Sequence, residues 1–130
     1  MSNVMFEIPF PPAILSPNAR PNRYALAKAK RDYRERCGWA GIAARQRHGS
    51  ALVPPVEAMV VFFVPDKRRR DEDNLRASLK AAWDGLVDSG LLEDDSADKF
   101  TVLRSTIAVR KGERMVWIHL SSREGLWGRA

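Results

Sequence analysis

The sequence predicts a mixed α+β domain over residues 1–130, with a small single sheet, two main helices and the element order β-α-β-α-β-β. Short apolar or alternating segments bounded by proline and glycine are typical of strands. Two longer segments carry apolar residues at three- and four-residue spacing, which is typical of one buried helix face. The length of 130 residues, with 45% hydrophobic and 29% charged residues, fits one globular domain with a substantial core.

Prolines delimit the first two predicted strands. We expect one strand over residues 4–10, because Pro11 and Pro12 cannot donate to a strand ladder. The run 56–64 is rich in valine and phenylalanine, is short enough for a well-buried strand and ends at Pro65.

Two alternating segments, 100–110 and 114–121, complete the predicted sheet. The turn between them, 110–113, predicts a β-hairpin in which Gly112 takes a positive φ. Residues 122–130 are expected to form a loose tail. Alternation predicts one shared face in each segment: Thr101, Leu103, Ser105, Ile107 and Val109 in the first, and Val116, Ile118 and Leu120 in the second.

Each predicted helix has one apolar face. The first begins at its cap, Asn22, and its glycines, Gly38 and Gly41, weaken the middle, so that a bend or break is expected there. The second covers about 73–89 and ends at Gly90. The expected core residues are Leu26, Ala29, Tyr33, Cys37, Ala40 and Ala44 in the first helix, and Leu75, Leu79, Ala82 and Leu86 in the second.

Basic residues outnumber acidic ones, 22 to 16, which gives a formal net charge of +6. The segment 20–47 is strongly basic, with two acids, Asp32 and Glu35. Such a concentration favours a phosphate-binding surface, although a solvated helix face is the alternative. The nine bases of this segment are Arg20, Arg23, Lys28, Lys30, Arg31, Arg34, Arg36, Arg45 and Arg47.

The single cysteine, Cys37, allows no intrachain disulfide and is expected to be a small core residue. Its lack of a partner favours a reducing compartment. The opening residues carry an acid and three prolines instead of an apolar signal segment, and nothing approaches the roughly 18 apolar residues of a membrane span. We therefore expect a cytoplasmic protein without membrane contact.

The segment 67–74 runs from four bases into three acids, at the junction of a strand and a helix. Asp71 and Asp73 are two residues apart, so within a helix they would point to opposite sides. They can share a cation only if Asp71 lies in the turn and Asp73 near the first helical position. The alternative is that these acids merely cap the helix.

Other residues favour a metal site over a cap. On a single helix, Asp73, Lys80 and Asp84 would share a face opposite the core stripe. Asp94 and Asp95 follow this helix, and a return turn could bring them toward the sheet. Mg²⁺ is usually bound by one or two carboxylates, waters and substrate phosphates, and the neighbouring bases are placed to hold such phosphates.

These motifs closely resemble those of the RusA-like Holliday-junction resolvases, which are crossover junction endodeoxyribonucleases. The resemblance covers most of the chain, except 36–54 and the residues after 121. Its most specific part is the string from Pro65 to Leu75. The further matching residues are Lys80, Asp84-Gly85-Leu86, Asp94-Asp95, and the opening Ile8-Pro9-Phe10-Pro11-Pro12 followed by Ser16, Asn18 and Arg20.

The resemblance implies that Asp71, Asp73 and Asp95 are the catalytic, metal-binding aspartates, with Asp94 beside them as a further ligand. Lys80 would be the catalytic lysine. It follows Asn74 by six residues where the family motif has three, so Arg76 competes for that role. The expected DNA-binding residues are Lys67, Arg68, Arg69, Arg70 and Arg76.

The same resemblance implies a cytosolic, often prophage-borne homodimer of DNA recombination and repair. Such enzymes require Mg²⁺, with Mn²⁺ as a substitute, and make paired nicks at four-way junctions. Because one domain carries one aspartate cluster, two symmetric nicks call for a C₂ dimer. Its interface is expected to include part of the set Phe62, Phe63, Trp83 and Trp117.

Two other functions remain open: a catalytically inactive, structure-specific DNA-binding module, and an interaction protein whose basic helix meets an acidic partner. Other chemistries lack their motifs. His48 and His119 have no cysteine or histidine at zinc-ligand spacing, and neither a nucleotide-binding P-loop nor a G-x-S-x-G elbow is present.

Overall fold

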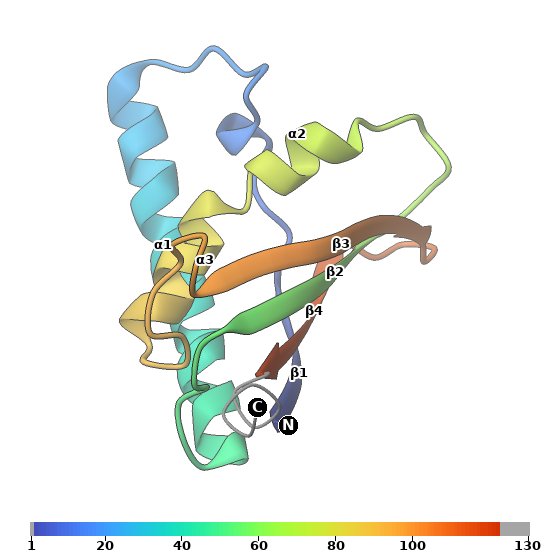
Figure 1. The fold of residues 1–130 in the computed structure, drawn as a ribbon. Coiled ribbons are helices and arrows are strands. Elements are labelled where there is room, and N and C mark those ends of the chain that lie inside the picture. Colours follow the sequence, from blue (N-terminus) through green and yellow to red (C-terminus); the bar gives the residue numbers. More distant parts are fainter. Residues whose placement is uncertain (1, 123–130) are drawn as a thin grey trace.

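The structure, a computed structural model, describes residues 2–122 and confirms the mixed α+β class, with one four-stranded sheet in the order β1-β4-β2-β3 (Figure 1). The predicted loose tail lies outside these residues, apart from Ser122, which ends the last strand. The elements are β1 (Ser2–Pro9), a 3₁₀ turn η1 (Ala13–Leu15), α1 (Arg23–His48), β2 (Val56–Val64), α2 (Glu72–Ala77), α3 (Lys80–Asp88), β3 (Phe100–Val109) and β4 (Met115–Ser122).

The predicted hairpin between the last two strands is wrong, although its turn forms with Gly112 at a φ of 77°. β2 lies between the two strands and pairs with β3 in parallel and with β4 antiparallel. The backbone N–H of Arg110 donates to the carbonyl of Val64, so the turn crosses the end of β2. Antiparallel pairing with β4 then places β1 at the far edge.

A β-bulge also overturns the shared face predicted for β3. Ala58 pairs with Val102 but Met59 pairs with Arg104, so Leu103 is an extra residue without a partner. Such an extra residue reverses the alternation of faces beyond it. Leu103 is therefore 56% exposed, whereas Ser105 is buried.

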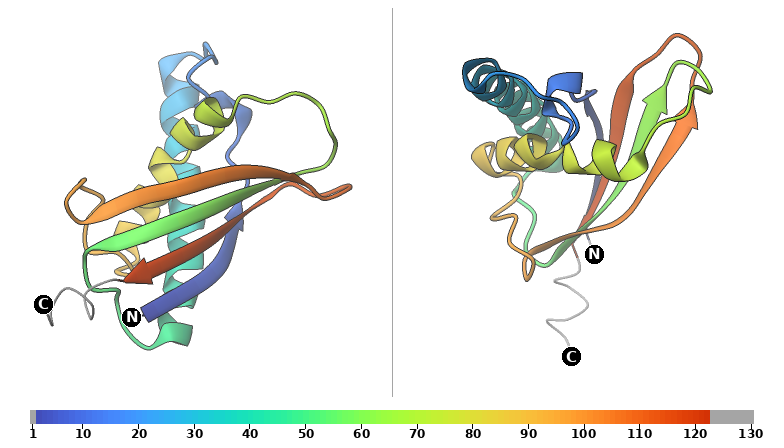
Figure 2. Two further views of the ribbon diagram at one scale, coloured as in Figure 1. Left: turned by 45° about the vertical axis from the view of Figure 1, so that its right-hand side comes forward. Right: turned by 90° about the horizontal axis from the view of Figure 1, so that it is seen from above.

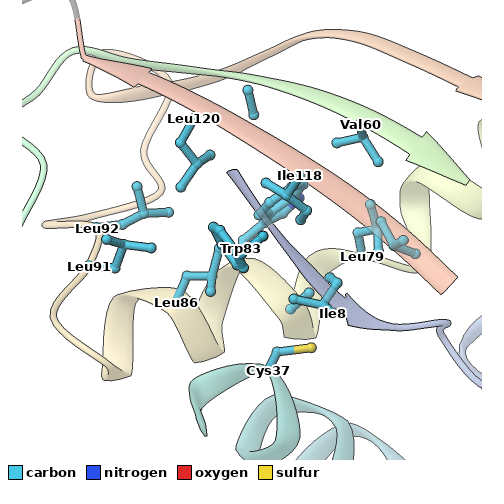
Figure 3. Close-up of a cluster of buried hydrophobic side chains, with 14 of the residues drawn as sticks. Ile8, Cys37, Val60, Leu79, Trp83, Leu86, Leu91, Leu92, Ile118 and Leu120 are labelled. Carbon is cyan, nitrogen blue, oxygen red and sulfur yellow. The ribbon is translucent and has the colours of Figure 1, made fainter. Parts of the chain in front are cut away.

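The core lies between the sheet and the helices, which cover one face of it (Figure 2). Alternate residues of β1, β2 and β4 point toward α1 and α3, and Figure 3 shows Ile8, Val60 and Ile118 in one cluster with Leu79 and the α3 residues Trp83 and Leu86. Val116, Ile118 and Leu120 are all buried, as the alternation predicted. No helix among residues 2–122 is long and apolar enough to span a bilayer.

α1 begins and ends as its sequence indicates. The Asn22 side chain accepts a hydrogen bond from the N–H of Ala25 at 2.8 Å, as predicted for an N-cap, and Gly49 ends the helix in the left-handed conformation. Tyr33 is buried and its hydroxyl donates to the carbonyl of Pro9 at 2.6 Å. Cys37 is buried as predicted, and burial raises the pKa of its thiol to about 12.

The expected break of α1 at its glycines does not occur. Instead, the glycines let the backbones of α1 and α3 approach closely. A β-carbon on Gly85 would lie 2.3 Å from the carbonyl oxygen of Arg34 and 2.9 Å from the nitrogen of Gly38. One on Gly41 would lie 2.4 Å from the hydroxyl of Ser89. The glycines therefore serve the helix contact, which a bulkier residue would push apart.

The predicted helix over 73–89 is two helices, because the chain breaks at Ser78 and Leu79. The Ser78 hydroxyl donates to the carbonyl of Asn74 at 2.8 Å, and the N–H of Leu79 bonds three residues back to Arg76. Both bonds compete with the regular helix ladder. The core stripe nevertheless forms as predicted, with Leu79, Ala82 and Leu86 buried and Leu75 packed against them.

The close contact makes a stability prediction. Gly85→Ala should lower the free energy of unfolding by about 2 kcal/mol, because the added carbon overlaps backbone atoms that cannot rotate away. Gly38→Ala is the matched control on the facing helix, since its β-carbon would meet its nearest neighbour at 3.4 Å, an ordinary contact. It should be neutral or stabilise by up to about 1 kcal/mol through helix propensity. Urea denaturation measures both, and equal effects would contradict this account.

Candidate active site

Asp71 and Asp73 take the positions that a shared cation requires. Asp71 is the N-cap of α2, with extended backbone at φ −92° and ψ 112°. Its Oδ1 accepts from the N–H groups of Asp73 at 2.9 Å and Asn74 at 3.3 Å. Asp73 is the second residue of the helix. The capping interpretation is thus correct for Asp71, and its second carboxyl oxygen makes no hydrogen bond within residues 2–122.

Both carboxylates are exposed and, within the described part of the chain, neither forms an ion pair, despite the four bases just before them. Arg70 folds back instead, donating from Nη1 to the carbonyls of Asp66 at 3.0 Å and Arg68 at 2.8 Å. The backbone N–H of Arg68 donates to Asp66, and this bond and the nearby Arg70 lower the pKa of the Asp66 carboxyl. The loop therefore satisfies Asp66 and leaves the two helix carboxylates open.

A second group of charges lies on α3 and the loop after it. Lys80 Nζ lies 3.0 Å from Asp84 Oδ1 and makes a short hydrogen bond to Asp95 Oδ2. The bonds to Asp95 and Asp84 raise the pKa of Lys80, and the bond from Lys80 lowers the pKa of Asp95. Asp94 accepts hydrogen bonds from the N–H of Asp95 and the hydroxyl of Ser96. Lys80 is accordingly a fixed cation.

The aspartates predicted to form one cluster lie in two groups. Among residues 2–122, no three acidic, histidine or cysteine side chains are placed together as metal ligands. The predicted single face of Asp73, Lys80 and Asp84 is wrong, because the break at Ser78 and Leu79 separates Asp73 from the other two. The loop after α3 brings Asp95 back to Lys80 on α3, whereas the return turn was expected to bring it toward the sheet.

The expected DNA-binding residues divide in the same way. Lys67, Arg68 and Arg69 are exposed in the loop after β2. Arg70 bonds the loop backbone, and Arg76 donates from Nη2 to the carbonyl of Val102 at 2.6 Å, which ties α2 to β3. Of the two rivals for the lysine role, Lys80 is the one that contacts an aspartate.

The groove between α1 and α3 borders the Lys80 group and has a volume of about 970 Å³. Arg34 pairs with Asp88 across it, at 2.5 and 2.7 Å. This bond holds the pKa of Asp88 below its usual range. Trp39, 64% exposed, also lines the groove. All nine bases of the 20–47 segment are exposed, so the predicted basic surface is present, with Arg34 already neutralised.

Sequence reasoning missed the bases of the turn after β3, Arg110, Lys111 and Arg114. This turn lies at the same end of the sheet as the 65–71 loop (Figure 1), because Arg110 bonds to the end of β2. The Arg110 guanidinium also lies over the ring of Phe63, 3.8 Å from its centroid. The three bases are visible in the sequence, but the hairpin prediction gave no reason to place Arg114 near Asp71.

Comparison with known proteins adds a relative but no function. No protein-family model matches the chain. An uncharacterized protein of Xylella fastidiosa (strain Temecula1) is 34% identical over 91 residues, which are 67% of this chain. The chain spans 58% of the length of that curated relative.

The Lys80 group makes a titration prediction. Lys80→Met should raise the pKa of Asp95, because the carboxylate loses its main cationic partner. Lys99→Met is the matched control: Lys99 pairs with Glu93 at 2.8 Å in the same loop, so it removes the same charge without touching Asp95. NMR titration of the Asp95 carboxyl carbon measures the shift. An unchanged midpoint in Lys80→Met would show that Lys80 does not hold Asp95.

Proposed function

We propose that this chain is a magnesium-dependent endodeoxyribonuclease that nicks branched DNA, with the four-way junction as its substrate. The observation that carries the proposal is the open pair Asp71 and Asp73 beside the unpaired bases Lys67, Arg68 and Arg69. These acidic and basic side chains do not pair with one another. The carboxylates are therefore available to a cation, and the bases are available to phosphates. The resemblance to RusA-like resolvases supports the same activity.

The donor set suits the proposed metal. Mg²⁺ is usually held by one or two carboxylates, with waters and substrate phosphates completing its shell, so the pair Asp71 and Asp73 is sufficient. Mn²⁺ has similar preferences for oxygen ligands and is a proposed substitute. Asp95 and Asp94 are the further ligands implied by the resemblance. Asp95 is already paired with Lys80, and Asp94 is hydrogen-bonded to its neighbours. A role for these two aspartates in binding the ion is therefore a prediction from the resemblance alone.

Each group has a proposed role in hydrolysis. A metal ion held by Asp71 and Asp73 would activate a water molecule and offset the negative charge that develops on the phosphate oxygens. Lys67, Arg68 and Arg69 bind backbone phosphates, each contact contributing to a salt-dependent affinity. Lys80 acts as a cation and not as a base, since its raised pKa keeps it protonated. We propose that the enzyme works in the cytoplasm, where a lone buried thiol such as Cys37 stays reduced.

The separation of the aspartates favours a second candidate, an inactive DNA-binding module. Such a module would use the same bases, bind junctions in EDTA and leave them intact. A third candidate, a protein that binds an acidic partner through α1, would show no preference for branched over linear DNA.

The proposal makes a catalytic prediction. Asp71→Asn and Asp73→Asn should each abolish nicking of a labelled four-way junction in Mg²⁺, because the amide removes the charge that the ion needs. Asn still caps a helix, so the fold should persist. Asp95→Asn is expected to do the same if the implied ligand set is correct. A denaturing gel scores the nicks and a gel shift in EDTA scores binding, which should be preserved.

Asp32→Asn is the matched control, because it neutralises an exposed aspartate on α1 that pairs with Lys28. It should nick at the wild-type rate. If Asp71→Asn nicks at the wild-type rate, Asp71 serves only as a helix cap and does not bind the metal ion. Intact junctions with the wild-type protein, bound equally with and without Mg²⁺, would favour the inactive module.

A homodimer completes the proposed activity, since two nicks need two sites. Two members of the set from which the interface was predicted, Phe62 and Trp83, lie in the core, which leaves Phe63 and Trp117 as candidates. Phe63 and Trp117 are half-buried on the opposite face of the sheet, which no helix of residues 2–122 covers (Figure 2). Met5 on this face is 60% exposed. We propose this open face as the dimer contact.

Light scattering should therefore give about twice the chain mass of 14.7 kDa at micromolar concentration. Trp117→Lys should shift the protein to monomer, because it places a charge within the apolar contact. Trp39→Lys is the control, since Trp39 lies on α1, on the helical side of the sheet. A wild-type monomer that still makes paired nicks would contradict the dimer.

A further inference from the structure

We propose that a hollow beside Asp71 binds a backbone phosphate of nucleic acid, with Arg114 as its principal ligand. The inference rests on the proposed function for its ligand, and it assigns a residue that neither the motif nor the basic loop includes.

Three segments that are distant in sequence form the hollow: the stretch 10–18, the start of α2, and the turn after β3. Its volume is about 360 Å³, within the range of roughly 300–1,000 Å³ typical of small-ligand sites. Phe10, Pro11 and Leu75 contribute apolar lining. The polar side chains on its wall are those of Ser16, Asn18, Arg70, Asp71, Asn74, Ser78 and Arg114.

Within the described part of the chain, the wall of the hollow has one free cation, Arg114. Its other guanidinium, that of Arg70, is paired with Asp66, and its one carboxylate, that of Asp71, already uses Oδ1 in capping α2. Arg114 is exposed and forms no ion pair within residues 2–122. Arg70 Nη2 is buried and pairs with Asp66 Oδ1 at 3.0 Å. As far as the described residues go, the hollow therefore has one unpaired guanidinium, that of Arg114, available to an anion.

The positive charge of Arg114 favours an anion over a neutral ligand, and the proposed DNA substrate supplies that anion as a phosphate. Guanidinium groups bind phosphate oxygens in pairs, and the bonds are stronger because both partners are charged. The side-chain amide of Asn18 adds a neutral donor. The apolar lining excludes water from one side, which strengthens an ionic contact. A strand lying over Asp71 and Asp73 would place a neighbouring phosphate in this hollow.

The test compares two bases of one turn. Arg114→Gln should weaken junction binding in EDTA roughly tenfold, as expected for one lost charge-assisted contact. It should also lower the slope of log affinity against log salt by about 0.9. Lys111→Gln, the matched control, removes the same charge from the same turn but does not line the hollow. Asn18→Ala should weaken binding without changing the slope, because it removes no charge.

A second measurement does not depend on nuclease activity. Titration of the wild-type protein with inorganic phosphate should shift the Nε–H resonances of Arg114 and Arg70, and leave that of Arg36 on α1 unchanged. Equal losses of junction affinity in Arg114→Gln and Lys111→Gln, or wild-type affinity in Arg114→Gln, would contradict phosphate binding in the hollow. The nuclease proposal would not be affected. Phosphate shifts in a protein that binds no DNA would support the hollow and reject the nuclease. If the protein shows neither phosphate-induced shifts nor DNA binding, both the phosphate site and the nuclease function are rejected.

Discussion

The backbone contact between α1 and α3 is the constraint on which the rest of the structure depends. Gly85 lies against Arg34 and Gly38 with no room for a side chain, so the axis of α3 is fixed relative to α1. This placement sets the core beneath the sheet, with Leu79 and Leu86 buried, and it aims Lys80 toward the groove between the helices. The charged group of Lys80 is thus positioned by packing, whereas that of Asp71 is positioned by a loop and a cap.

The sequence was sufficient to predict features that depend on interactions between residues close together in the chain. Strand β2 has the predicted bounds, Asn22 caps α1, and Asp71 lies in the turn with Asp73 near the helix start. It was insufficient for features that depend on pairing with a strand far away in the sequence. Alternation could not reveal the bulge at Leu103, because the bulge exists only relative to β2. The hairpin failed for the same reason: nothing within residues 100–121 indicates that β2 separates the strands.

The candidate site shows the same limit. Residue types and spacing identified the carboxylates and the basic loop, which are contiguous in sequence. They did not predict that Ser78 would break the helix and divide the aspartates, since its hydroxyl competes with the backbone only through a weak local bond. Nor did they bring Arg114 beside Asp71, because that proximity results from a turn crossing over the end of β2.

The central position of β4 has a consequence for how the chain folds. Within residues 2–122, β1 has no strand partner except β4, and more than a hundred residues separate their paired positions, such as Val4 and Leu120. β1 is synthesised before the other three strands of this sheet, so it must wait for residues 115–122 before it can join them. Contacts of such long sequence separation slow folding. Until they form, the helices and the β2–β3 pair carry the apolar surface that β1 and β4 later cover.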